Sequence, residues 1–108
     1  MRYVIAIAAV FLLGGTMLAD AADDASAEAL MKKSKCFTCH SIDKKKDGPP
    51  YKEVAAKYKG KADAEATLYK HLTTHPTVKV DGREEKHESL KSTDDKEIKN
   101  VISFILSR

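Results

Sequence analysis

The sequence predicts an all-α domain of about four helices. Helix start signals precede several apolar segments, an apolar stripe with helical period lies near the C-terminal end, and no segment reads convincingly as a strand. The chain has 108 residues and a net charge of +3, a mild balance that gives no reason to expect a nucleic-acid partner. A chain of this length has room for only a small hydrophobic core.

The first 21 residues have the features of a secretory signal peptide. Arg2 precedes an apolar stretch over residues 3–18, and Ala19–Ala21 places small residues at the two positions that a signal peptidase reads. A membrane anchor is the alternative, because the apolar stretch is only slightly shorter than the ~17 residues that can span a bilayer. We expect residues 1–21 to be removed, leaving one exported domain at 22–108 that does not contact the membrane.

The first two helices are placed by their start and stop signals. Ser26 can cap a helix over residues 27–35. The segment Gly48–Pro50 is a rigid loop with few backbone donors and cannot be helical. After this loop we expect a short helix over residues 51–59, which ends at Gly60 in the usual C-terminal stop position.

A third helix follows, and then an irregular segment. Asp63 can cap a helix over residues 64–74, which Pro76 stops. Residues 77–90 are heavily charged and carry the turn signal Asp81-Gly82, so they are expected to be irregular.

The last helix is the most strongly patterned element. Ser92-x-x-Asp95 resembles a capping box for a helix that starts at residue 93 or 94 and runs to 107. Apolar residues recur at helical spacing along one stripe, which is expected to face the core. These residues are Ile98, Val101, Ile102, Ile105 and Leu106.

One motif carries chemistry. Cys36 and Cys39 are three positions apart and His40 follows directly, which is the spacing that attaches a c-type haem through two thioethers and one iron–imidazole bond. A thioredoxin-like pair would need a βαβ context, a zinc site would need two further ligands at ordered spacing, and a disulfide across two residues would be strained. We therefore expect Cys36, Cys39 and His40 to bind one covalent haem.

The chain resembles the class I cytochromes c, and within them the small bacterial c551/c8 type. The similarity is carried by Cys36–Asp43 and by Gly48–Tyr58, and it weakens between Thr73 and Lys91. The resemblance implies a small fold of about four helices around the haem, with the first and last helices crossing. It also implies that the carbonyl of Pro49 accepts a hydrogen bond from Nδ1 of His40.

The second axial ligand departs from this family. The family uses a methionine a few residues before the cap of the last helix, but no methionine follows Cys39 in this chain. His87 lies at the equivalent distance before Thr93-Asp94-Asp95, and imidazole is a competent axial ligand. We expect His87 to bind the iron opposite His40.

Other sixth ligands remain possible from the sequence. His75 precedes a helix stop and His71 lies within a predicted helix, and either could take the place of His87. A lysine or an iron with an open position are further alternatives.

The expected function is one-electron transfer in the periplasm, without enzymatic activity. Two imidazole ligands would lower the reduction potential relative to a His/Met pair and leave no open site. A haem protein that binds small gaseous ligands, or a haem subunit of a periplasmic oxidoreductase, are the alternatives. The expected partners are redox proteins, and an acidic one would suit the lysines flanking the motif. These are Lys32, Lys33, Lys35, Lys44, Lys45 and Lys46.

Overall fold

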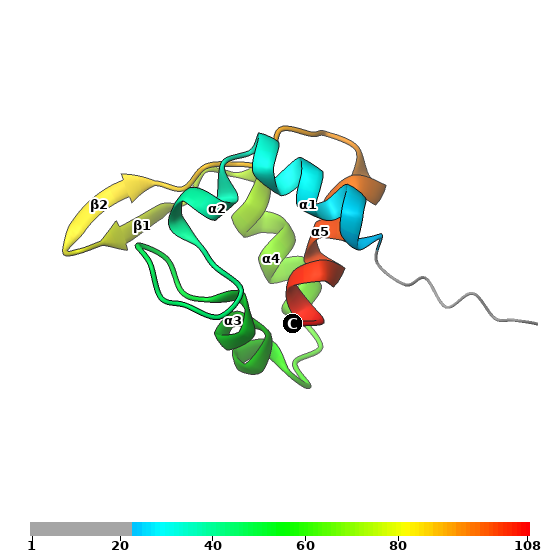
Figure 1. Cartoon of the computed structure of the whole chain (residues 1–108), viewed down its shortest axis with the longest axis horizontal. Coiled ribbons are helices and arrows are strands. Elements are labelled where there is room, and N and C mark those ends of the chain that lie inside the picture. Colours follow the sequence, from blue (N-terminus) through cyan, green and yellow to red (C-terminus); the bar gives the residue numbers. More distant parts are fainter. Residues whose placement is uncertain (1–22) are drawn as a thin grey trace, which may run out of the picture.

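The computed structural model describes residues 23–108 as five helices and one two-stranded antiparallel sheet (Figure 1). The predicted signal peptide and its cleavage site lie outside these residues. The mostly helical fold class is confirmed, with one small sheet added. Within residues 23–108, no helix is long and apolar enough to cross a membrane.

Helix α1, Asp24–Lys33, begins three residues earlier than predicted. Asp23 is the N-cap, because its carboxylate accepts hydrogen bonds from the backbone N–H of Ser26 at 3.2 Å and from its hydroxyl at 2.6 Å. The helix also ends earlier, since Lys35 adopts a left-handed conformation with φ of 63°. Helix α2, Cys36–Cys39, is therefore a separate turn.

The middle helices follow the prediction closely. Helix α3, Tyr51–Tyr58, ends just before Gly60, whose φ of 75° lies in the region that glycine tolerates. Helix α4, Ala64–Thr73, begins after Asp63 as expected, although the Asp63 side chain makes no capping hydrogen bond.

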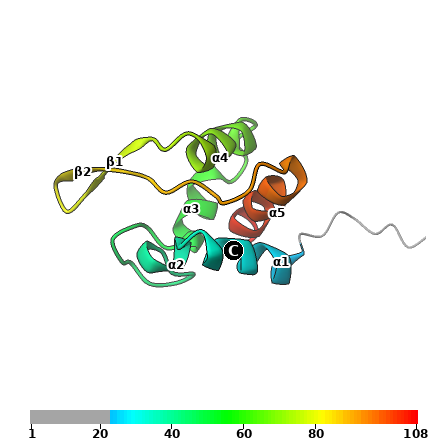
Figure 2. The same ribbon diagram turned by 90° about the horizontal axis from the view of Figure 1, so that it is seen from above.

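A β-hairpin replaces the predicted irregular segment, which corrects the expectation of no strand. Strand β1, Thr77–Val80, pairs antiparallel with β2, Arg83–Lys86, through the two-residue turn Asp81-Gly82. Both turn residues have positive φ, at 50° and 78°, as a tight hairpin turn requires. Both strands are only four residues long. In β1, Val78 and Val80 alternate with Thr77 and Lys79, but β2 is wholly charged, so the apolar alternation is too short to predict a pair of strands. Figure 2 shows the hairpin extending away from the helices.

Helix α5, Asp95–Leu106, is capped by Asp94 and not by the predicted Ser92. The Asp94 carboxylate accepts from the backbone N–H groups of Lys96 and Glu97 at 2.8 and 3.2 Å. Ser92 instead donates its hydroxyl to the Glu97 carboxylate at 2.5 Å. The predicted start is thus correct within two residues, but the capping side chain is different.

The core forms where α5 packs against α1, α3 and α4 (Figures 1 and 2). The apolar stripe of α5 faces this core as predicted, and Leu30 of α1 packs against the same cluster. The largest side chains with almost no exposed surface are Phe104, Met31, Ile102 and Val101. Four elements therefore share one small core.

Polar contacts join the two ends of the described chain. The Asn100 side chain accepts from the backbone N–H of Asp23 at 2.8 Å and donates to its carbonyl at 2.9 Å. Arg108 pairs with the carboxylate of Asp24 at 2.9 Å, and its guanidinium lies 4.1 Å from the ring centre of Phe104. These contacts fix the start of α1 against α5.

Replacing Phe104 by Ala should destabilise the holoprotein by about 3–5 kcal/mol, because it removes a fully buried ring and leaves a cavity between the helices. Denaturant unfolding followed by circular dichroism measures the effect. Ser103→Ala is the matched control, since Ser103 is exposed on the same helix and its loss should change the free energy of unfolding by at most about 0.5 kcal/mol. Equal effects of the two substitutions would contradict the packing described here.

Candidate functional site

The two cysteines lie on one helical turn. Residues three apart on a helix share a face, so α2 directs Cys36 and Cys39 to the same side. Both thiols are free; Cys36 is half-buried and Cys39 is exposed. Burial raises the pKa of the Cys36 thiol, which keeps it protonated before any bond is formed. The pair can thus bond to one flat group lying across this face.

His40 follows α2 in an extended conformation that turns its ring away from the helix. The hydrogen bond implied by the resemblance is present, with His40 Nδ1 and the Pro49 carbonyl 2.7 Å apart. A carbonyl oxygen only accepts, so Nδ1 carries the proton and Nε2 has a free lone pair for a metal. Gly48 lies directly against the ring, because a Cβ built there would be 2.4 Å from His40 Cε1.

Tyr51 completes the support of His40, a role that the sequence did not suggest. Its ring stacks on the imidazole with centres 4.9 Å apart and planes 22° apart, and it meets Phe37 edge-on at 6.1 Å. Tyr51 is almost fully buried, and burial raises the pKa of its phenol, so it remains neutral. Its placement comes from the loop, since the backbone N–H of Tyr51 donates to the Ser41 carbonyl at 2.9 Å.

The structure brings His87 to His40. The two rings lie 6.1 Å apart between centres, and His87 Nδ1 is buried without a hydrogen-bond partner among the described residues. The backbone of His87 is held by its N–H to the Pro76 carbonyl at 2.8 Å. The His75 ring lies 3.2 Å from the His87 carbonyl. His87, which directly follows the hairpin, thus lies next to His40.

The two rival histidines occupy different places. His71 of α4 lies 4.3 Å from His87 between ring centres, so it belongs to the same cluster. His75 is exposed, and its ring contacts the backbone of His87. Burial, and then the neighbouring His71 and His40, lower the pKa of His87 to about 4. Burial likewise lowers the pKa of His71. Both rings are therefore neutral at pH 7, as a metal ligand must be.

The donor set fits one haem. Imidazole nitrogens bond to a metal at about 2.0–2.1 Å, which places the centres of two rings on one ion roughly 6 Å apart. The separation of His40 and His87 is 6.1 Å. The orphaned Nδ1 of His87 and the two free thiols on one face of α2 agree with this reading. Cys36, Cys39 and His40 would hold the group, and His87 lies near enough to His40 to approach the same iron.

Comparisons with known proteins find cytochromes c. A family model described as cytochrome c matches residues 25–108. The chain is 48% identical over 61 residues to cytochrome c-551 of Pseudomonas aeruginosa, covering 56% of this chain and 59% of that protein. It thus spans under two thirds of that relative's length. A second cytochrome c-551, from Stutzerimonas stutzeri, is 45% identical over 60 residues, covering 56% of this chain and 58% of that protein.

Solved structures show the same fold. The class 1 cytochrome MtoD from Sideroxydans lithotrophicus ES-1 superposes with a TM-score of 0.77 at 47% identity, covering 81% of this chain and 97% of that one. Cytochrome c552 of Nitrosomonas europaea superposes with a TM-score of 0.58 at 28% identity, covering 74% of this chain and 96% of that one.

Replacing Gly48 by Ala should displace the His40 ring, because the added methyl group would overlap three of its atoms. We expect the haem absorption spectrum to change and the unfolding free energy to fall by about 1–3 kcal/mol. Gly60→Ala is the control: its methyl meets nothing within 4 Å, and the positive φ costs about 1–2 kcal/mol without touching the site. An unchanged spectrum in Gly48→Ala would contradict this packing.

Proposed function

Because this chain belongs to the cytochrome c family, we propose that it is a periplasmic one-electron carrier whose single haem has two histidine ligands. The haem is attached through Cys36 and Cys39, the two cysteines of the chain. In the proposal its iron is bound by His40 on one side and His87 on the other. The separation of the two rings, 6.1 Å, is the observation that carries the proposal.

The polypeptide keeps the sixth position closed. His87 is held by the hydrogen bond to Pro76 and by contact with the His75 ring. Just beyond it, the backbone N–H of Leu90 donates to the Leu72 carbonyl of α4 at 2.9 Å. A ligand anchored on both sides resists displacement, which suits electron transfer and argues against a site that binds an exchangeable small molecule.

The type of axial ligand determines whether the reduction potential of the haem is higher or lower than that of a His/Met cytochrome. The haem supplies an iron that accepts and gives one electron. Histidine nitrogens stabilise the ferric state more than a methionine sulfur does, so the potential should be lower than that of a His/Met cytochrome. The Pro49 carbonyl adds to this effect, because its hydrogen bond at 2.7 Å makes the His40 ring more electron-rich.

The periplasmic location is supported by the predicted signal peptide at residues 1–21 and by the need to attach haem to reduced thiols outside the cytoplasm. The proposed partners are acidic redox proteins. Lys32, Lys33 and Lys35 precede or join α2 and are exposed, as are Lys44 and Lys45 on the other side of the motif. Their charge would attract an acidic surface.

Replacing His87 by Ala should open the iron. The ferric protein should change from low to high spin, and the ferrous protein should bind carbon monoxide, which the unmodified protein should resist. Absorption spectroscopy with and without carbon monoxide measures both changes.

His75→Ala and His71→Gln are the matched controls, because each removes a rival imidazole. Neither should raise carbon monoxide binding to the level of His87→Ala. If His75→Ala opened the iron and His87→Ala left the spectrum unchanged, the assignment of the sixth ligand would be wrong. If the unmodified ferrous protein bound carbon monoxide rapidly, a gas-binding protein would be the better description.

The exposed lysines should make electron transfer depend on salt. Oxidation of the ferrous protein by anionic hexacyanoferrate should slow as ionic strength rises, since the Debye length falls from about 10 Å at 0.1 M to about 3 Å at 1 M. Stopped-flow absorption measures the rate.

Lys44→Glu/Lys45→Glu should weaken this dependence more than Lys91→Glu/Lys96→Glu, which changes the net charge equally at a different exposed site. Identical behaviour of the two variants would mean that net charge alone, and not the lysines beside α2, attracts the oxidant.

A further inference from the structure

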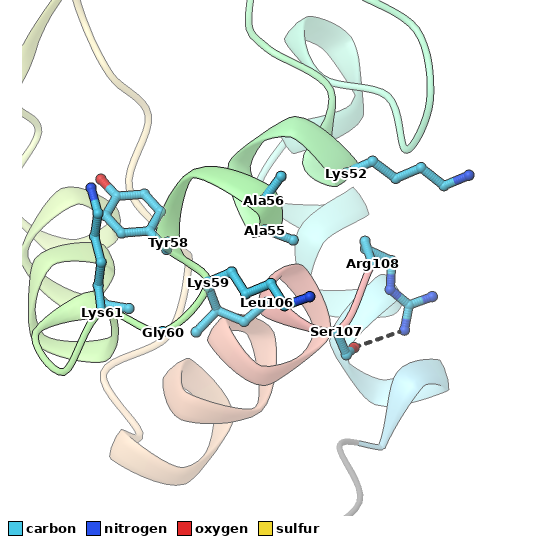
Figure 3. A pocket seen from close by; sticks show the side chains of 11 residues that line it. Lys52, Ala55, Ala56, Tyr58, Lys59, Gly60, Lys61, Leu106, Ser107 and Arg108 are labelled. Carbon is cyan, nitrogen blue, oxygen red and sulfur yellow. Dashed lines mark hydrogen bonds between the residues drawn. The ribbon is translucent and has the colours of Figure 1, made fainter.

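A basic groove lies on a part of the molecule that the haem residues do not use. It runs between α3, the turn into α4 and the end of α5 (Figure 3). Lys52, Lys59, Lys61 and Arg108 contribute its charged side chains, and no Asp or Glu side chain lines it. Its volume is about 630 Å³.

The floor of the groove is formed by short apolar side chains. Ala55 and Ala56 of α3 and Leu106 of α5 line it. Ala56 is exposed and Leu106 is partly exposed, so these two side chains offer an apolar contact to an incoming side chain, whereas Ala55 is buried. The groove therefore combines a basic rim with an apolar floor.

The cations divide into paired and unpaired groups. Lys52 has a partner in Asp43 at 2.6 Å, and Arg108 has one in Asp24 at 2.9 Å. Among the described residues, Lys59 and Lys61 form no ion pair, and both are exposed.

Two lysine ammonium groups lie close to the Tyr58 ring, beside the groove. The ammonium groups of Lys57 and Lys61 lie 5.5 and 5.7 Å from its ring centre, within the range of a cation–π contact. Figure 3 shows Lys61 alongside this ring. Two positive charges therefore lie beside the Tyr58 ring, where an added anion would be attracted.

We infer that the basic groove binds an acidic, extended segment of a partner protein, with an apolar side chain of that segment on the alanine floor. Carboxylates would pair with Lys59 and Lys61, which have no acidic partner in the fold. A concave site fits an extended chain better than it fits the flat surface of a membrane. Cys36, Cys39 and His40 are not among the residues that line the groove.

The experiment titrates isotope-labelled holoprotein with a synthetic peptide, Glu-Asp-Leu-Glu-Asp with blocked ends, and follows amide chemical shifts. The shifts should concentrate at residues 55–64 and 106–108. Affinity should fall about tenfold in Lys59→Glu/Lys61→Glu, since two attractive contacts become repulsive. A peptide with Ser in place of Leu should bind more weakly than the original.

Lys91→Glu/Lys96→Glu is the matched control, because it changes the same net charge near the start of α5, outside the groove, and should alter the affinity no more than about twofold. Thermal unfolding and haem absorption verify that both variants fold. Equal losses in the two variants would overturn the inference in favour of general electrostatic attraction. It would also be overturned if phosphatidylglycerol vesicles, and not the peptide, moved the signals at residues 55–64 and 106–108.

Discussion

The packing of α5 is the constraint on which the other elements depend. This helix is the only one among the described residues that contacts α1, α3 and α4 together. Through α1 it positions the turn that bears both cysteines, and through α3 it fixes Tyr51 against the His40 ring. Through α4 it supports Leu72, to which the segment after His87 is bonded. The buried stripe of α5 thus determines the positions of the His40 and His87 imidazoles.

The two sides of the site are built in different ways. On the His40 side, close packing and a hydrogen bond fix the ring, with Gly48, Pro49 and Tyr51 each touching it. On the His87 side the backbone is anchored, while Nδ1 of the ring lacks a partner and His71 packs beside it. The His40 ring is fixed by the side chains and carbonyl around it. The position of the His87 ring instead depends on the backbone segment that carries it.

Sequence reasoning succeeded where the signals were local. Helices α3 and α4 were placed well because a proline loop, a glycine stop and a following proline act within a few residues. The sequence does not predict the capping residue where a neighbouring side chain competes for the same role, nor a contact between residues far apart in the chain. Asp23 replaced Ser26 as a cap because the Ser26 hydroxyl donates to it.

The candidate site divides in the same way. Cys36, Cys39 and His40 follow from spacing alone, and the Pro49 contact follows from the resemblance. The stacking of Tyr51 on His40 and the contact between His71 and His87 are visible only in the folded structure. His71 and His87 are 16 positions apart in the sequence, so no local pattern predicts their contact. The hairpin was missed because β2 contains four charged residues and no apolar ones, although its Asp-Gly turn was noted.

The composition of that hairpin also bears on aggregation. A two-stranded ribbon leaves the outer edge of each strand without a neighbour, and such edges can recruit strands from other molecules. Here the strands are only four residues long, and Lys79, Glu84 and Lys86 place charges along them. Charged, short edges discourage pairing between copies. The ribbon that carries His87 at its base is thereby protected against strand pairing with other copies.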